Sequence, residues 1–93
     1  MPDKQVESAY QIDFREMKFP IIAVYQNPED YPGMYVARVW EVDRPTNVVI
    51  VKKDSDGLQQ DIATHTGMAW LPRSPKDHKV LVGTWIKEAQ WNG

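Results

Sequence analysis

The sequence has two histidines, His65 and His78, and they are its most obvious candidates for metal binding or acid–base chemistry. They are far apart, and neither has a second ligand at the spacing that a helical or hairpin metal site requires. The chain has no cysteine, which excludes thiolate metal sites and disulfides. His65 falls in the last turn of an expected helix, where a partly charged imidazole is favourable in its own right. We therefore assign no metal ion and no cofactor.

Carboxylates are numerous, and a general acid–base pair would need two of them buried close together with shifted pKa values. Most of these acids fall instead in turns or at the expected helix start, where they serve solubility and capping. The chain also lacks the Gly-x-Ser-x-Gly motif of a nucleophile elbow. We therefore expect no enzyme activity and assign no catalytic residue. The acids considered are Glu29, Asp30, Glu41, Asp43, Asp54, Asp56, Asp61 and Asp77.

The stretch 70–85 combines basic and aromatic side chains: Arg73, Lys76 and Lys79 lie between Trp70 and Trp85. Single-stranded nucleic acids are bound by such combinations, through phosphate contacts and base stacking. The net charge of −2 argues against phosphate binding as the main function. RNA or single-stranded nucleic acid binding is therefore the alternative function, beside the interpretation of a solvated loop whose tryptophans pack inward.

Aromatic side chains are the best candidates for a protein interface, because they are enriched among the residues that dominate binding energy. We assign a partner-binding role to Tyr31, Trp70, Trp85 and Trp91. Trp91 lies in a polar tail, where it either binds a partner or folds back on its own sheet. Trp40, in the middle of an expected strand, is expected in the core.

Three β-rich runs, 19–26, 34–43 and 48–53, must position these residues. Turn residues separate them at 27–33 and 44–47, and such short links favour antiparallel pairing. A helix is expected next, capped by Asp54 or Ser55 and ending at Gly67. Leu58 and Ile62 lie four residues apart and form its apolar face.

Residues 68–78 are expected to be irregular because they contain Pro72 and Pro75, and 79–86 form a further strand with Gly83 at a bulge or close approach. The predicted fold is α+β with the order β-β-β-α-β: a four-stranded, mainly antiparallel sheet with one short helix on one face. Length and composition predict one domain over 1–93. It comprises a partly mobile lead-in at 1–18, a folded core at 19–86 and a tail at 87–93.

The chain contains no apolar run of about 18 residues, which a transmembrane helix needs. Its first residues are polar and acidic, unlike the basic and then apolar regions of a signal peptide. We therefore expect a cytoplasmic protein that does not enter membranes.

The order of strands and helix, with Tyr35, Val36, Pro45, Asp54 and Ser55, resembles the N-terminal domain of HicB-type antitoxins. The family usually has a Pro-Gly corner where this chain has residues 44–46, and we expect no DNA-binding segment in residues 87–93. The resemblance implies a small α+β domain that oligomerises and binds a protein partner, without DNA binding. The stretch 71–86 is similar to segments of small bacterial proteins.

These observations favour a small non-enzymatic module for protein–protein interaction or self-association, with a homo-oligomer or a protein complex as the expected state. Its expected surfaces are a sheet edge, whose unpaired backbone groups invite pairing, and the four partner-binding aromatics named above.

Overall fold

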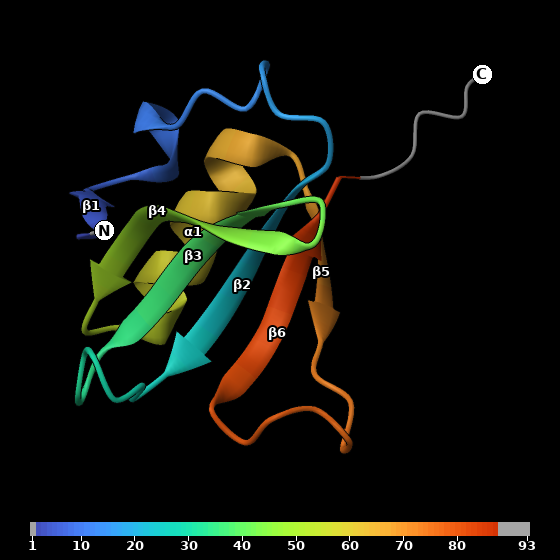
Figure 1. The fold of residues 1–93 in the computed structure, drawn as a ribbon. Helices are drawn as coiled ribbons and strands as arrows, with labels where there is room; N and C mark the ends of the chain where they lie inside the picture. The colour runs from blue at the N-terminus through green and yellow to red at the C-terminus, as the bar shows by residue number, and fades with distance from the viewer. Residues whose placement is uncertain (1, 88–93) are drawn as a thin grey trace.

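The computed structural model describes residues 2–87, in which six strands form one sheet and a single α-helix packs on one of its faces (Figure 1). The strand order is β1-β4-β3-β2-β6-β5; β1 is parallel to β4, and all other neighbours are antiparallel. The expected α+β class, with one helix on one face, is confirmed. In chain order the elements are β1 (Lys4–Val6), the 3-10 helix η1 (Ala9–Gln11), β2 (Pro20–Gln26), β3 (Tyr35–Glu41), β4 (Arg44–Lys52), α1 (Ser55–Thr66), β5 (Ala69–Pro72) and β6 (Leu81–Ile86).

The expectation of four strands is wrong, because β1 and β5 add one strand at each edge and β1 makes the sheet mixed. β1 has three residues without apolar alternation, so its sequence carries no strand signal. β5 falls in the stretch 68–78, which was expected to be irregular. Pro72 is its last residue, a position on an edge strand where a missing N–H is tolerated.

The expected connection at 44–47 is also wrong, because β4 already begins at Arg44 and the hairpin turn consists of Val42 and Asp43. Pro45 is accommodated beside a register shift in the pairing of β3 with β4. Thr46 stabilises that irregular region, since its hydroxyl donates to the Val39 carbonyl at 2.8 Å. A bulge next to a proline interrupts the local pattern by which a strand is recognised.

Helix α1 begins and ends where the sequence predicts. The Asp54 carboxylate accepts a hydrogen bond from the Gly57 N–H at 2.8 Å, and Gly67 ends the helix with φ 69°. Leu58 and Ile62 are fully buried against the sheet. The helix therefore depends on this apolar pair for its position.

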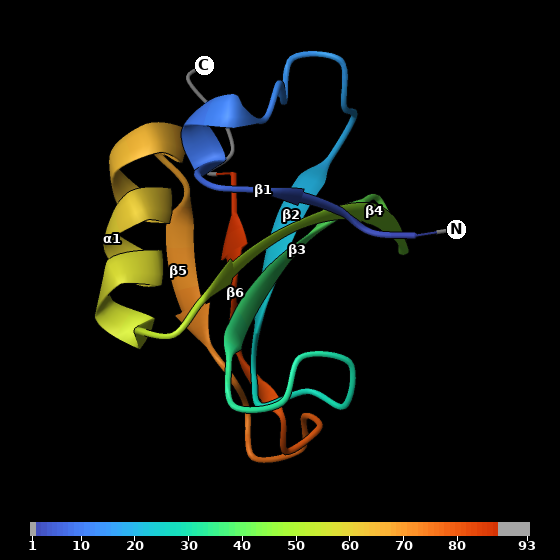
Figure 2. The same ribbon diagram turned by 90° about the vertical axis from the view of Figure 1, so that its left-hand side faces the viewer.

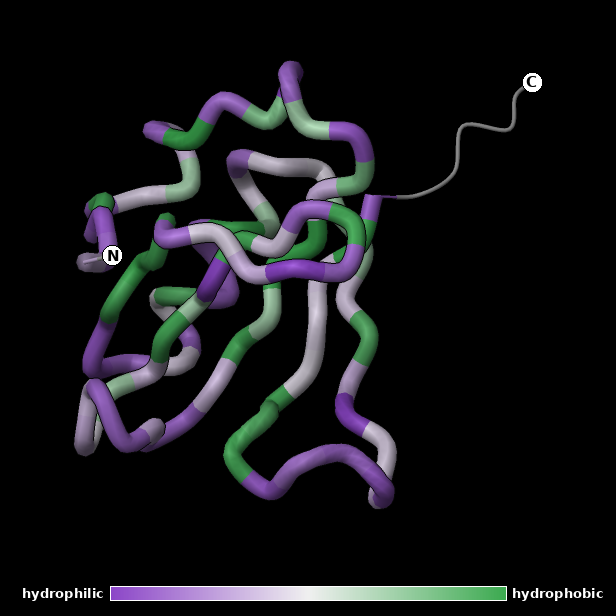
Figure 3. The backbone as a smooth tube through the Cα atoms, viewed as in Figure 1, coloured by the Kyte–Doolittle hydropathy of each residue, from purple (hydrophilic) through white to green (hydrophobic). Residues whose placement is uncertain are grey.

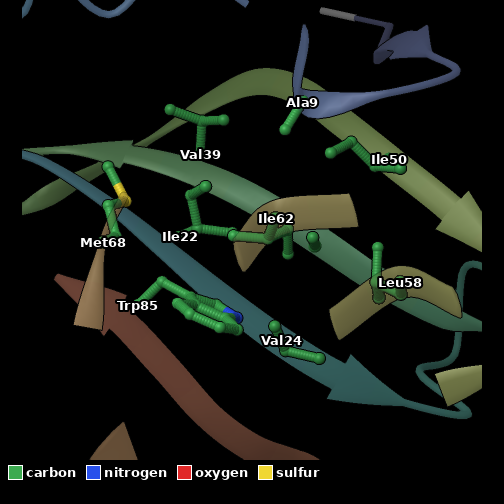
Figure 4. Packing of buried hydrophobic residues seen from close by; sticks show 10 residues of the cluster. Ala9, Ile22, Val24, Val39, Ile50, Leu58, Ile62, Met68 and Trp85 are labelled. Atoms are coloured by element: carbon green, nitrogen blue, oxygen red, sulfur yellow. The ribbon is translucent and has the colours of Figure 1, made fainter. Parts of the chain in front are cut away.

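The core lies between α1 and the sheet, and close packing there constrains the residues of β5 and β6 (Figure 4). Gly83 is confirmed at a close approach: an added Cβ would lie 2.6 Å from the Leu71 carbonyl oxygen and from the Trp70 ring. Trp85 is buried beside it. The buried core residues are Ala9, Ile22, Val24, Ala37, Val39, Ile50, Leu58, Ile62, Met68 and Trp85.

Hydrophobic residues concentrate in the strands, whereas the β2–β3 and β5–β6 loops are mostly hydrophilic (Figure 3).

The N-terminal segment contacts both sides of the molecule as it passes the β4 edge of the sheet (Figure 2). Asp3 binds Arg38 of β3, whereas the Ser8 hydroxyl and the Ala9 N–H both donate to Asp61 of α1 at 2.7 Å. Ala9 is buried in the core. This part of the expected lead-in therefore belongs to the packed structure.

Candidate interaction surface

The face of the sheet opposite α1 is nearly as apolar as the face that α1 covers. Side chains alternate along a strand, so Ile22 and Val39, which are paired in the core, alternate with Ile21 and Trp40, which are paired on the other side. Among residues 2–87 no helix covers that second side (Figure 2). We call it the helix-free face. In its four central strands the alternate positions are Ile21, Ala23, Tyr25, Val36, Arg38, Trp40, Val49, Val51, Thr84 and Ile86.

The end of the sheet at the β3–β4 hairpin carries large exposed apolar side chains. The exposed fractions of Phe19 and Val42 are 69 % and 49 %, and the Val42 N–H donates to the Phe19 carbonyl at 3.1 Å. Ile21 follows Phe19 and pairs with Trp40 on one side and with Ile86 on the other. We call these five residues the apolar end. An exposed apolar cluster on a small domain is typical of a binding surface.

The backbone at the apolar end is strained. Val42 has φ 60°, a conformation that β-branched residues rarely adopt and that costs on the order of 1–3 kcal/mol. In two-residue hairpin turns such positions favour Gly, Asn or Asp. A bulky apolar residue is thus held at an exposed turn against its backbone preference.

Trp40 lies at the centre of the apolar end, outside the core where it was expected. Its side chain is half-buried, and its Nε1–H is shielded from solvent without a hydrogen-bond acceptor in the described structure. A buried donor left unsatisfied costs about 1–3 kcal/mol. Its mid-strand position alone could not distinguish the two faces of β3, because both are apolar.

The opposite end of the helix-free face holds a charged network around Arg38. The Arg38 guanidinium donates to both Asp3 carboxylate oxygens at 2.9 and 3.1 Å and to the Thr46 carbonyl at 3.0 Å. The Tyr31 hydroxyl donates to Asp3 at 2.8 Å, and Asp30 lies 3.7 Å from the guanidinium. We call Asp3, Asp30, Tyr31 and Arg38 the Arg38 network.

Hydrogen bonds within the Arg38 network shift the pKa values of Asp3, Tyr31 and Arg38. Hydrogen bonds from Arg38 and then Tyr31 lower the pKa of Asp3, because they stabilise the carboxylate. The hydrogen bond to Asp3 raises the pKa of Tyr31 and of Arg38, since it favours the protonated donor. Asp3 is therefore a stable anion that joins the N-terminal segment to β3 and to the β2–β3 loop.

A hollow of about 240 Å³ adjoins this network. Tyr25 and Val36, which pair across β2 and β3, contribute to it from the sheet. Its other lining residues come from the two loops at this end of the sheet and from the network. The complete lining is Tyr25, Pro28, Asp30, Val36, Arg38 and Val80.

The four aromatics predicted to bind a partner are not brought together. Tyr31 belongs to the Arg38 network, and Trp91 lies outside the described residues. Trp70 and Trp85 pack on each other on the α1 side, with ring centroids 5.3 Å apart, and the Trp85 Nε1–H donates to Gln59 at 3.0 Å. Because Trp85 is 6 % exposed, a partner on this side would meet Trp70 first. Their partner-binding role stays a prediction.

The side chains predicted to bind nucleic acid are exposed on the β5–β6 loop: Arg73, Lys76 and Lys79. Arg73 donates to the Asp77 carbonyl at 3.0 Å, and Asp77 accepts from the Ser74 N–H at 2.8 Å, so the loop is held by its own turn. The neighbouring tryptophans face α1 rather than this loop's solvent side. Nucleic-acid binding by these three basic side chains stays a prediction.

Acids and histidines do not converge within the described part of the chain, where no group of three or more could hold a metal ion. His65 Nε2 lies 3.8 Å from Asp61, which accepts from the Ser8 hydroxyl. The Asp61 carboxylate thus lies between the Ser8 hydroxyl and the His65 imidazole. In nucleophilic catalysis the hydroxyl would instead form a hydrogen bond to the imidazole. The Ser8–Asp61 contact instead fixes η1 on α1.

The residues not predicted from the sequence include Arg38, Phe19, Val42 and Asp3. Arg38 is a charged residue in the middle of β3 with apolar residues on both sides, a pattern that indicates a paired or functional side chain. Phe19 precedes Pro20 at the beginning of β2, where an exposed phenylalanine has no local explanation. Asp3 gave no signal, because its partner lies 35 positions away.

Comparisons with known proteins give no match to a family model, a curated protein sequence or a solved structure. The resemblance to HicB-type antitoxins therefore stays a prediction. No helix between residues 2 and 87 has both the length and the apolar character needed to cross a bilayer.

Proposed function

We propose that this chain is a non-enzymatic interaction module that binds a protein partner through the helix-free face of its sheet. The observation that carries the proposal is the apolar end, where Phe19 and Val42 are 69 % and 49 % exposed beside the half-buried Trp40. Burying such side chains is the main favourable term in protein association.

The surroundings of the apolar end support an interface. Charged side chains of both signs, Lys18, Glu41, Asp43 and Arg44, line a hollow of about 330 Å³ beside Val42. Protein interfaces combine an apolar centre with a polar rim of this kind. A rim with two acids and two bases does not repel a partner of either sign at long range.

The sheet edges support a face rather than an edge as the binding surface. β1 has three residues, and β5 has four and ends in Pro72. Short edge strands and edge prolines are the devices by which proteins prevent strand addition. The sheet edge that the sequence suggested is therefore a weaker candidate than the apolar end.

Three variants test the proposal: Phe19→Ser, Val42→Asn and, as a matched control, Tyr10→Ser. Tyr10 is 77 % exposed and packs on His65 of α1, away from the helix-free face. Size-exclusion chromatography with light scattering is combined with affinity capture from a lysate. We expect Phe19→Ser and Val42→Asn to lose self-association or the captured protein, and Tyr10→Ser to keep it. A monomeric wild-type chain that captures no protein would overturn the proposal, as would equal behaviour of all three variants.

A further inference from the structure

One carboxylate, Asp30, and one guanidinium, Arg38, line the hollow at the Arg38 network. Arg38 is already paired with Asp3, which lies outside the lining and is closer to Arg38 than Asp30 is. Asp3 is fully engaged, since both of its oxygens accept from Arg38 and one accepts also from Tyr31. The less compensated of the two carboxylates is therefore Asp30.

Arg38 holds Asp30 less tightly than it holds Asp3, so Asp30 can accept a further cation. Its side chain is 61 % exposed, and its distance of 3.7 Å from Arg38 Nη2 is longer than a hydrogen bond. Arg38 is less suited to an anionic ligand, because three of its five N–H donors already bind Asp3 and the Thr46 carbonyl. The charge balance thus favours a positive ligand over a negative one.

The other lining residues suit the stem of a long basic side chain. Pro28, Val36 and Val80 are apolar, and Tyr25 adds an aromatic ring. Lysine and arginine bury their methylene stems on apolar surface while the charged head remains at a polar rim. A cation close to a tyrosine ring gains a further attraction from the ring electrons.

We propose that this hollow binds a lysine or arginine side chain of a protein partner, with the charged head on Asp30 and the stem against Pro28 and Val80. The inference rests on the proposed function in one respect, that the basic group comes from a protein docked on the helix-free face. The hollow and the apolar end share that face, since Val36 and Trp40 are alternate residues of β3. A bound segment can therefore contact both.

The test uses the full chain and the capped peptide Gly-Lys-Gly, followed by the NMR shifts of the Val36 and Val80 methyl groups. The same peptide with norleucine keeps the stem and removes the charge. Asp30→Asn removes the proposed contact. Glu29→Gln is the matched control, because Glu29 is the adjacent exposed acid and does not line the hollow.

We expect saturable shifts with the lysine peptide, at least fivefold weaker binding of the norleucine peptide, and at least fivefold weaker lysine-peptide binding by Asp30→Asn. Glu29→Gln should stay within twofold of wild type. Free n-butylamine should bind more weakly than the peptide, and equal or tighter binding would overturn the assignment to a protein side chain. Absence of shifts, or equal shifts in Asp30→Asn, would overturn the site itself. Neither result depends on the association tested with Phe19→Ser, so the two proposals fail separately.

Discussion

The tryptophans on the two faces of the sheet differ in burial and in hydrogen bonding. On the α1 side Trp85 is buried, packs on Trp70 and donates its Nε1–H to Gln59. On the helix-free side Trp40 is half-buried, and its Nε1–H has no acceptor within residues 2–87. A face whose polar groups are satisfied and whose apolar groups are covered serves stability. The other face retains exposed apolar side chains, a strained turn and an unsatisfied donor, and these features support the proposed binding surface.

The comparison is tested most strongly by truncating one isoleucine on each face. Ile62→Ala removes a fully buried side chain of α1, and we expect it to lower the free energy of unfolding by about 2–5 kcal/mol. Ile21→Ala, on the helix-free face, should cost about 1 kcal/mol in the isolated chain, since Ile21 is only half-buried. Urea denaturation followed by circular dichroism measures both. Equal losses would show that the helix-free face is as much a part of the core as the covered one.

A smaller effect is expected for the two indoles. Trp85→Phe should lower the free energy of unfolding by about 2 kcal/mol, because it reduces core packing and leaves Gln59 without its donor. Trp40→Phe removes a donor that has no acceptor, so the loss of packing is offset and the net change should stay below about 1 kcal/mol. The same denaturation measurement compares them. A larger loss for Trp40→Phe would contradict the assignment of the two faces.

The smallest effect concerns the Arg38 network and depends on pH. Asp3→Asn should lower stability by about 1 kcal/mol at pH 7, because it replaces a charge-assisted pair that is partly exposed. The folded-state pKa of Asp3 lies below the ordinary aspartate value of about 4. Its contribution is therefore complete above that ordinary value and is lost as pH falls through the lowered folded-state pKa.

Stability of wild type and Asp3→Asn measured from pH 7 to pH 2 checks this expectation. The difference between the two proteins should be constant down to about pH 5 and then shrink. A difference that grows as the pH falls would contradict the pairing of Asp3 with Arg38.

The sequence predicted what local signals determine. The strand 20–26 follows from a β-branched run, and α1 follows from its capping residue Asp54, from Leu58 and Ile62 at helical spacing, and from Gly67. These residues act on neighbours within a few positions. Their structure therefore depends little on the rest of the chain.

The candidate sites were not predicted, because long-range pairing forms them. Arg38 and Asp3 are 35 positions apart, and Trp85 and Gln59 are 26 apart. Nothing in the alternation of β3 shows which apolar side would receive α1, so Trp40 was assigned to the wrong face. β1 forms because it pairs with the edge of β4 and because Arg38 binds Asp3, the residue before β1. The three residues of β1 indicate neither contact.

The N-terminal segment has one further consequence. It is fastened to β3 at Asp3 and to α1 at Asp61, so it clasps the sheet from both sides around the outer edge of β4 (Figure 2). Trimming the chain to begin at Phe19 would open this clasp, baring the β4 edge and one flank of α1 together. A shortened chain would thus expose surfaces that the full chain covers. Its self-association and protein binding would therefore differ from those of the full chain.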